Sequence, residues 1–254
     1  GSSGSSGMTQ FWLWVGFIGM VIGCIYFGMK ASAMRRREGM EFPLESFFIT
    51  LWAAALYLTM ILGETVTPIN GQTVFWGRYI DWVVTTPLLL MELGVIAGLR
   101  PKLIAGVMGA DIFMIVTGFI GAVEAPPYNY LWWLISTGSF LAILGSLLTE
   151  YSASAKRRNG RINSLFQTLR NILIVLWICY PIVWILGAEG FHVISVGWET
   201  LCYSVLDVCA KVGFGFVVVS AGNETLAQAS NSDRIMETVH SYMQSEEREQ
   251  SPYR

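Results

Sequence analysis

The stretch that decides the fold is LDVCAKVGF, residues 206–214, inside an apolar run from about residue 195 to about residue 221. A helix that crosses the hydrocarbon core of a bilayer needs roughly 20 mostly apolar residues, and this run is long enough. Lys211 is the only lysine deep in such a run. A lone ammonium there is costly. Lys211 is therefore either a structural partner of a carboxylate or the amine of a Schiff base with an aldehyde, and burial alone does not choose between them.

Six further runs of the same kind precede this one, so we expect an all-α membrane protein, a bundle of seven transmembrane helices. The expected spans cover about residues 10–33, 45–66, 75–98, 102–123, 129–152, 166–188 and 195–221. The composition agrees, because 54% of the residues are hydrophobic and 13% are charged, against about 25% charged in soluble domains. The net charge of −2 gives no basis for nucleic-acid binding.

The chain divides into three parts. Residues 1–7, GSSGSSG, have the composition of an expression tag rather than of a structural segment. Residues 8–222 are expected to form one helical domain. The polar tail, residues 223–254, is expected to be disordered in the cytoplasm.

Basic residues predict the orientation. The loops after the first, third and fifth spans carry Lys30, Arg35, Arg36, Arg37, Arg100, Lys102, Lys156, Arg157, Arg158 and Arg161. The loops after the second, fourth and sixth spans carry no Lys or Arg. By the positive-inside rule, the N-terminus is expected outside and the C-terminus in the cytoplasm.

Buried charges are the strongest functional signal in the chain. Asp207 precedes Lys211 by four residues and shares its helix face, as a counterion or as a structural salt-bridge partner. In the third span Asp81, Thr85 and Glu92 share another face, with the two carboxyls about 16 Å apart along the axis. Asp81 is expected nearer the outside and Glu92 nearer the cytoplasm. Intramembrane acids are usually functional, so this face predicts a proton path, and unrelated polar packing is the alternative.

Two acids flank the loop between the sixth and seventh spans. Glu189 and Glu199 are either ordinary loop acids or, if their side chains converge, a pair that shares a proton at the exit of the path. The four cysteines show no CxxC spacing and have no histidine nearby, so we expect no metal site.

Three motifs resemble those of the microbial (type 1) rhodopsins. They are the third-helix stretch RYIDWVVTTPLLL (78–90), the sixth-helix stretch LWICYPIVW (176–184) and the seventh-helix stretch 206–214. The resemblance covers about residues 10–220. It implies all-trans retinal bound covalently to Lys211 as a protonated Schiff base.

The resemblance also implies roles for individual residues. Asp81 matches the counterion and first proton acceptor, Asp207 the second counterion, and Glu92 the cytoplasmic proton donor. Arg78 matches the residue that gates proton release, and Glu189 and Glu199 match a release pair. Asp111 matches a structural aspartate near the retinal ring. Positions of the retinal pocket are matched by Tyr57, Trp82, Thr85, Thr86, Leu89, Met114, Gly118, Trp133, Ser136, Thr137, Trp177, Tyr180 and Trp184.

The triplet Asp81, Thr85 and Glu92 resembles that of light-driven outward proton pumps. A sensory rhodopsin that signals to a partner protein is the alternative, but a sensor does not need a donor such as Glu92. Glu as donor is a bacterial feature and the release pair an archaeal one, and this mixture is similar to the cyanobacterial cyanorhodopsins. On this reading the chain is a transporter of a prokaryotic plasma membrane and no enzyme.

The resemblance carries expectations about colour and partners. Leu89 implies green absorption. Trp133 stands where carotenoid-binding relatives have Gly, so we expect no antenna carotenoid. The expected partners are the lipid bilayer and further copies of the chain, with a trimer favoured over a pentamer.

Overall fold

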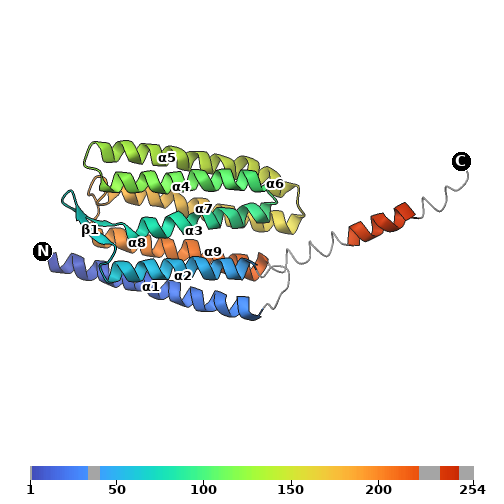
Figure 1. Cartoon of the computed structure of the whole chain (residues 1–254), viewed down its shortest axis with the longest axis horizontal. Helices are drawn as coiled ribbons and strands as arrows, with labels where there is room; N and C mark the ends of the chain where they lie inside the picture. Colours follow the sequence, from blue (N-terminus) through green and yellow to red (C-terminus); the bar gives the residue numbers. More distant parts are fainter. Residues whose placement is uncertain (1, 34–40, 223–234, 246–254) are drawn as a thin grey trace, which may run out of the picture.

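The computed structural model describes residues 2–33, 41–222 and 235–245 (Figure 1). Its elements are α1 (Ser2–Ala33), α2 (Glu41–Ile61), β1 (Val66–Ile69), β2 (Gln72–Phe75), α3 (Gly77–Ala97), α4 (Pro101–Val123), α5 (Tyr128–Ser146), η1 (Leu147–Tyr151), α6 (Ser152–Lys156), α7 (Gly160–Leu186), α8 (Val196–Val208), η2 (Cys209–Gly213), α9 (Phe214–Val217) and η3 (Val218–Gly222). Because α5 continues through η1 into α6, and α8 continues through η2 and α9 into η3, the described residues contain 7 membrane-length helices. The expected seven-helix bundle is confirmed.

The segment between α2 and α3 differs from the expectation. The second helix ends at Ile61, and β1 and β2 then form an antiparallel hairpin in the register Val66↔Phe75 and Ile69↔Gln72. Asn70 and Gly71 form its turn with φ values of 52° and 75°. Positive φ at both central residues is what a two-residue hairpin turn of the Asn-Gly type requires. The hairpin adds a two-stranded element to the all-α bundle and marks one end of it, here called the hairpin end.

Other parts of the chain also differ from the expectation, and α1 begins at Ser2 rather than near residue 10. The sixth helix begins at Gly160 rather than near residue 166, because the Asn159 side chain accepts a hydrogen bond from Ile162 N at 3.0 Å and caps a polar first turn. In the tail, residues 235–245 form a helix although the tail was expected to be disordered. Ile235 and Val239 lie one turn apart in it, a helical spacing that its polar composition hid. The rest of the tail, like Arg35, Arg36 and Arg37, lies outside the described residues.

Polar and apolar residues are distributed as in a protein embedded in a lipid bilayer. Asp81, Glu92, Asp111 and Asp207 are 0% exposed, whereas many large apolar side chains, such as Leu134 at 60%, cover the outside. Charged groups inside and apolar groups outside are the reverse of what a water-soluble protein shows. This distribution fits a helix bundle that is surrounded by the hydrocarbon of a bilayer.

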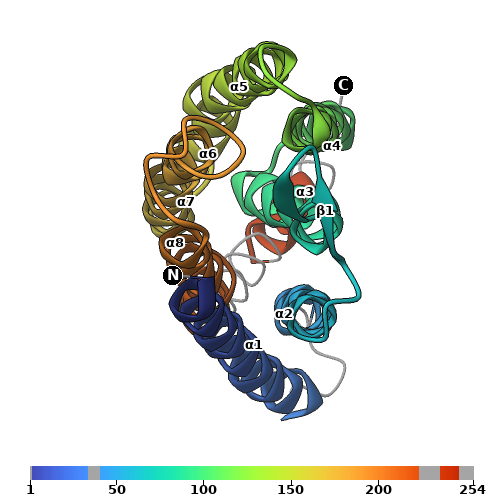
Figure 2. The same ribbon diagram turned by 90° about the vertical axis from the view of Figure 1, so that its left-hand side faces the viewer.

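Helix α3 lies near the middle of the bundle. Seen from the hairpin end, it lies inside the arc formed by the other helices (Figure 2). It packs against α2, α4 and α7, and so brings its polar face to the centre of the protein. The buried charges of α3 and of the seventh span therefore meet in the interior.

Candidate functional site

Lys211 lies on η2 and is 2% exposed. Its Nζ forms ion pairs with Asp207 Oδ1 at 3.3 Å and with Asp81 Oδ2 at 3.7 Å. Asp207 reaches it from one turn away on α8, and Asp81 reaches it from α3. The π-helical turn around Lys211 is a rare geometry that is frequent at functional sites. The structure thus brings two carboxyls to Lys211: Asp207, which the helix spacing predicts, and Asp81, which the resemblance implies.

Asp207 is held firmly by its neighbours. Its Oδ2 accepts a hydrogen bond from Tyr57 Oη at 2.5 Å, and its Oδ1 accepts hydrogen bonds from Tyr180 Oη at 2.5 Å and Trp82 Nε1 at 3.2 Å. Together with Lys211, four donors surround one carboxylate. Hydrogen bonds to a charged acceptor are short and strong, so donors in this number fix the position of the carboxylate.

Asp81 has far fewer partners. Its Oδ1 accepts a hydrogen bond from Thr85 Oγ1 at 3.2 Å. Its Oδ2 is buried and has no hydrogen-bond partner among the described residues. The two carboxyls beside Lys211 therefore differ in kind: Asp207 is saturated, and Asp81 keeps one oxygen able to take up a proton.

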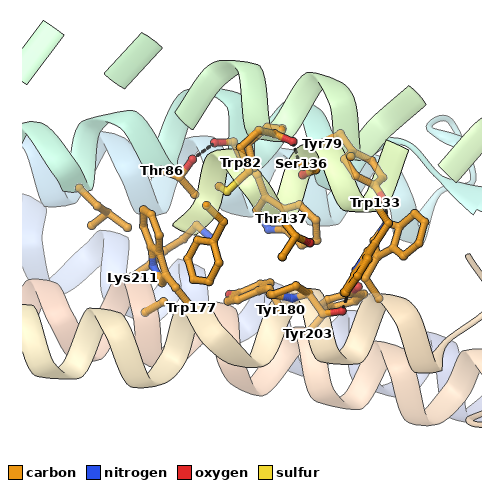
Figure 3. Close-up of a pocket in the computed structure, with 18 residues that line it drawn as sticks. Tyr79, Trp82, Thr86, Trp133, Ser136, Thr137, Trp177, Tyr180, Tyr203 and Lys211 are labelled. Carbon is orange, nitrogen blue, oxygen red and sulfur yellow. Dashed lines mark hydrogen bonds between the residues drawn. The ribbon is translucent and has the colours of Figure 1, made fainter. Parts of the chain in front are cut away.

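A cavity extends from Lys211 between α3, α4, α5 and α7 (Figure 3). Its empty volume is about 780 Å³, including the space at its open side. It is lined by Tyr79, Trp82, Thr86, Leu89, Met114, Ile115, Gly118, Trp133, Ser136, Thr137, Phe140, Trp177, Tyr180, Pro181, Trp184, Tyr203, Ala210 and Lys211. Lys211 lies at one end of it and Trp133 at the other. The shape suits a long apolar molecule attached at the lysine.

Two of the predicted pocket residues do not line this cavity. Tyr57 contacts Asp207 and Thr85 contacts Asp81, so both adjoin the charged centre instead. Among the lining residues that the sequence reasoning missed is Tyr203, which precedes Asp207 by four residues and Lys211 by eight. That spacing on one helix face was the signal that could have found it.

Asp111 lies beside the cavity without lining it. It is buried on α4 and accepts a hydrogen bond from Thr86 Oγ1 on α3. This contact ties α3 and α4 together.

Glu189 and Glu199 come together at the hairpin end. Their side chains interact, Ala188 N donates to Glu199 Oε2 at 3.0 Å, and Glu199 is 1% exposed. Burial and the neighbouring Glu199 raise the pKa of Glu189 well above its ordinary value. Arg78 is buried nearby and donates to Thr200 Oγ1 at 3.0 Å. Two neighbouring carboxyls of this kind can share one proton.

Glu92 lies on α3 toward the opposite end. It is 0% exposed, and neither of its carboxyl oxygens has a hydrogen-bond partner among the described residues. A buried carboxyl with so little support is stable only while it holds its proton. The structure thus places carboxyls at three depths: Glu189 and Glu199, then Asp81 and Asp207, then Glu92.

The sequence is similar to known proteins over most of its length. The sequence model of the bacteriorhodopsin-like protein family matches residues 7–224. Bacteriorhodopsin of Haloterrigena sp. (strain arg-4) is 44% identical over 221 residues, which cover 85% of this chain and 88% of the relative. Archaerhodopsin-2 of Halobacterium sp. (strain aus-2) is 41% identical over 214 residues, which cover 82% of this chain and 83% of the relative.

Solved structures agree with these relatives. A cyanorhodopsin of the cyanobacterium Tolypothrix sp. NIES-4075 superposes with a TM-score of 0.85 at 69% identity, covering 88% of this chain and 98% of that chain. A thermophilic rhodopsin of Rubrobacter xylanophilus superposes with a TM-score of 0.80 at 38% identity, covering 84% and 95%.

Proposed function

We propose a residue-by-residue mechanism for this chain, which belongs to the bacteriorhodopsin-like family and is a light-driven outward proton pump of the cyanorhodopsin type. Its family implies retinal on a lysine, and we assign that lysine as Lys211. The observation that carries the assignment is the contact of Lys211 Nζ with two unequal carboxyls, one saturated with donors and one with an oxygen left unbonded.

The residues present fit all-trans retinal. Lys211 supplies the amine, and the apolar, largely aromatic cavity extends away from it toward Trp133. Asp207 and Asp81 supply negative charge at the nitrogen, so the positive charge of a protonated Schiff base would be stabilised there. When bound, retinal supplies light absorption and a change of shape that alters the reach of the proton on Lys211 Nζ.

Asp81 takes the proton that leaves Lys211 Nζ. Its unbonded Oδ2 lies 3.7 Å from that nitrogen, a short movement away from proton transfer. Asp207 keeps its charge, because Tyr57, Tyr180 and Trp82 continue to donate to it. The transfer neutralises Asp81 and frees Arg78, three residues nearer the hairpin end, to act on the acids there.

Release and refilling occur at opposite ends. Glu189 and Glu199, close to Arg78, release a proton at the hairpin end, which we assign as the outside of the cell. Glu92, held protonated by burial, returns a proton to Lys211 Nζ from the cytoplasmic side. The basic loops place the same end in the cytoplasm by the positive-inside rule.

We propose a homotrimer in preference to a pentamer. We also propose that no antenna carotenoid binds, since the bulky Trp133 lines the cavity and its Nε1 donates to Pro181 O at 3.1 Å. A sensory role is the second candidate function. The buried Glu92 disfavours it, because a costly intramembrane acid serves fast reprotonation rather than signalling.

Chemical trapping tests the assignment of the cofactor. The protein is expressed with all-trans retinal, reduced with borohydride and digested with a protease, and the masses of the peptides are measured by mass spectrometry. We expect a retinyl group on the peptide that contains Lys211 and no visible band in Lys211→Ala. A retinyl group on another lysine, or an unmodified Lys211 in a coloured sample, would overturn the assignment.

A further inference from the structure

Arg78 is a buried cation with little polar support. It is 3% exposed, and no ion pair between its guanidinium and a carboxylate is found among the described residues. Its Nη2 donates to Thr200 Oγ1, and its Nε has no hydrogen-bond partner in the described part of the chain. A buried guanidinium is costly unless other groups stabilise its charge. Contacts of another kind must therefore stabilise Arg78.

Two aromatic rings make such contacts. Arg78 Cζ lies 4.6 Å from the centroid of the Phe75 ring and 4.8 Å from the centroid of the Tyr203 ring. The face of an aromatic ring attracts a cation at this distance, and more strongly when water is excluded. Phe75 ends β2 and is 7% exposed, and Tyr203 lies on α8 and is 1% exposed. The guanidinium thus links the hairpin to the seventh span.

Each of the two rings also lines a cavity, and the two cavities are different. Tyr203 lines the cavity that is assigned to retinal. Phe75 lines a second cavity at the hairpin end, with an empty volume of about 760 Å³ including the space at its open side. The walls of this outer cavity also include Gln10, Leu13, Met60, Val66 and Thr73. Gln10 and Thr73 are exposed, so the outer cavity reaches the surface.

Phe75, Arg78 and Tyr203 therefore form a row of contacts that begins at the outer cavity and ends at the retinal cavity. Such a row can keep water from passing between the two cavities. Exclusion of water strengthens the electrostatic interactions in a site and prevents leakage of protons. A purely apolar plug would also exclude water, but it would not respond to a change of charge nearby.

We propose that Phe75 and Tyr203 are positioning residues that hold Arg78 in a seal between the outer cavity and the retinal cavity; this rests on the proposed attachment of retinal. While Asp81, three residues along α3, is charged, it attracts the guanidinium from the inner side. When Asp81 takes up a proton this attraction ends, and the guanidinium moves along the ring faces toward the acids at the hairpin end. The rings keep the cation out of water throughout this movement.

Bleaching by hydroxylamine in the dark tests the seal on the full-length, retinal-loaded protein in lipid. Hydroxylamine is a small polar nucleophile that reaches the Schiff base through openings in the protein and releases retinal as its oxime. The rate at which the visible band disappears therefore measures access to Lys211. The matched control is Leu13→Ala, because Leu13 is 2% exposed and lines the same outer cavity but has no aromatic ring to offer Arg78.

Removal of either ring should speed up bleaching. Phe75→Leu and Tyr203→Leu keep an apolar side chain but lose the aromatic face, and each should bleach about 10-fold faster, the effect of losing one cation–π contact to a desolvated cation. Phe75→Tyr and Tyr203→Phe keep the ring and should bleach at the unmodified rate. Arg78→Gln, which removes the cation and leaves both rings, should also bleach faster. Leu13→Ala should not.

Solid-state NMR with isotope-labelled arginine gives a readout that does not depend on pumping or on bleaching. The Arg78 Nε signal is identified as the one that is lost in Arg78→Gln. It should shift in Phe75→Leu and in Tyr203→Leu, because a nearby ring changes the resonance of a nucleus that lies over its face. It should stay near its place in Phe75→Tyr, Tyr203→Phe and Leu13→Ala. A merely structural role of the rings predicts altered folding without this pattern.

The outcomes separate the seal from the attachment of retinal. If Lys211→Ala is colourless while both leucine variants bleach at the unmodified rate, the seal is wrong and the attachment stands. Equal acceleration in Leu13→Ala would also overturn the seal, since general loosening of the bundle would then explain the bleaching. If Lys211→Ala stays coloured, the attachment is wrong, and an Arg78 signal that ignores both rings would overturn the positioning role. Should the leucine variants fail to fold, an unmodified bleaching rate in Arg78→Gln would overturn the seal.

Discussion

The hydroxyl of Tyr57 should contribute measurably to the stability of the site. Tyr57 is 1% exposed, and its Oη donates to Asp207 Oδ2 at 2.5 Å. Tyr57→Phe removes the only donor found for that oxygen among the described residues while leaving the ring in place. A hydrogen bond to a buried charged acceptor contributes about 1.5–3 kcal/mol, so we expect a loss of about 2 kcal/mol in the free energy of unfolding.

Tyr203 provides a matched control in the same site. It is also 1% exposed, and its ring stacks on Tyr180 with centroids 5.8 Å apart. Its hydroxyl, however, has no hydrogen-bond partner among the described residues. Tyr203→Phe should therefore leave stability unchanged or raise it, because it removes a buried polar atom that gains nothing from folding.

The two variants are compared by reversible unfolding in mixed micelles of increasing denaturing detergent, followed by circular dichroism. A difference of about 2 kcal/mol is roughly 30-fold in the unfolding equilibrium. Asp207→Asn in combination with Tyr57→Phe closes a double-mutant cycle, and the two losses should not add. Equal effects of the two Tyr→Phe changes would refute the view that Asp207 is fixed by its donors.

Three further outcomes follow from single contacts. A Cβ at Gly187 would lie 2.6 Å from the Glu199 carboxyl and would displace it. Gly187→Ala should therefore delay proton release, measured with a pH-indicating dye, without changing the colour of the protein. An unchanged release time would contradict this. Burial and Glu199 raise the pKa of Glu189, so stability is lost as pH rises from about 4.3 toward the folded pKa. The free energy of unfolding of Glu189→Gln should therefore rise relative to that of the unmodified protein by up to about 1.4 kcal/mol per pH unit in that window. This appears as a difference in Tm that widens with pH, and a constant difference would contradict the shared proton. Thr86→Val removes the α3–α4 hydrogen bond to Asp111 and should lower the free energy of unfolding in detergent by about 1–3 kcal/mol. An unchanged free energy of unfolding would contradict this.

Much of the site followed from chain spacing. The helical repeat brings Asp207 to Lys211, and the cost of charge in lipid marks Asp81 and Glu92 as functional. Contacts between helices could not be derived in this way. The three donors to Asp207 come from three different helices, and only the packed bundle shows that Asp81 lacks such donors.

Local rules explain the misplaced boundaries. Asn70 and Gly71 form a hairpin signal between two expected spans, and Asn159 is a capping residue inside a basic loop.

Outward pumping is tested most directly by the pH outside unbuffered cells that express the chain with all-trans retinal under green light. We expect the medium to become more acidic, the change to vanish with a protonophore, and Asp81→Asn to remain coloured but pump nothing. A coloured protein that leaves the pH unchanged, or an Asp81→Asn variant that pumps as well as the unmodified protein, would contradict outward transport through Asp81.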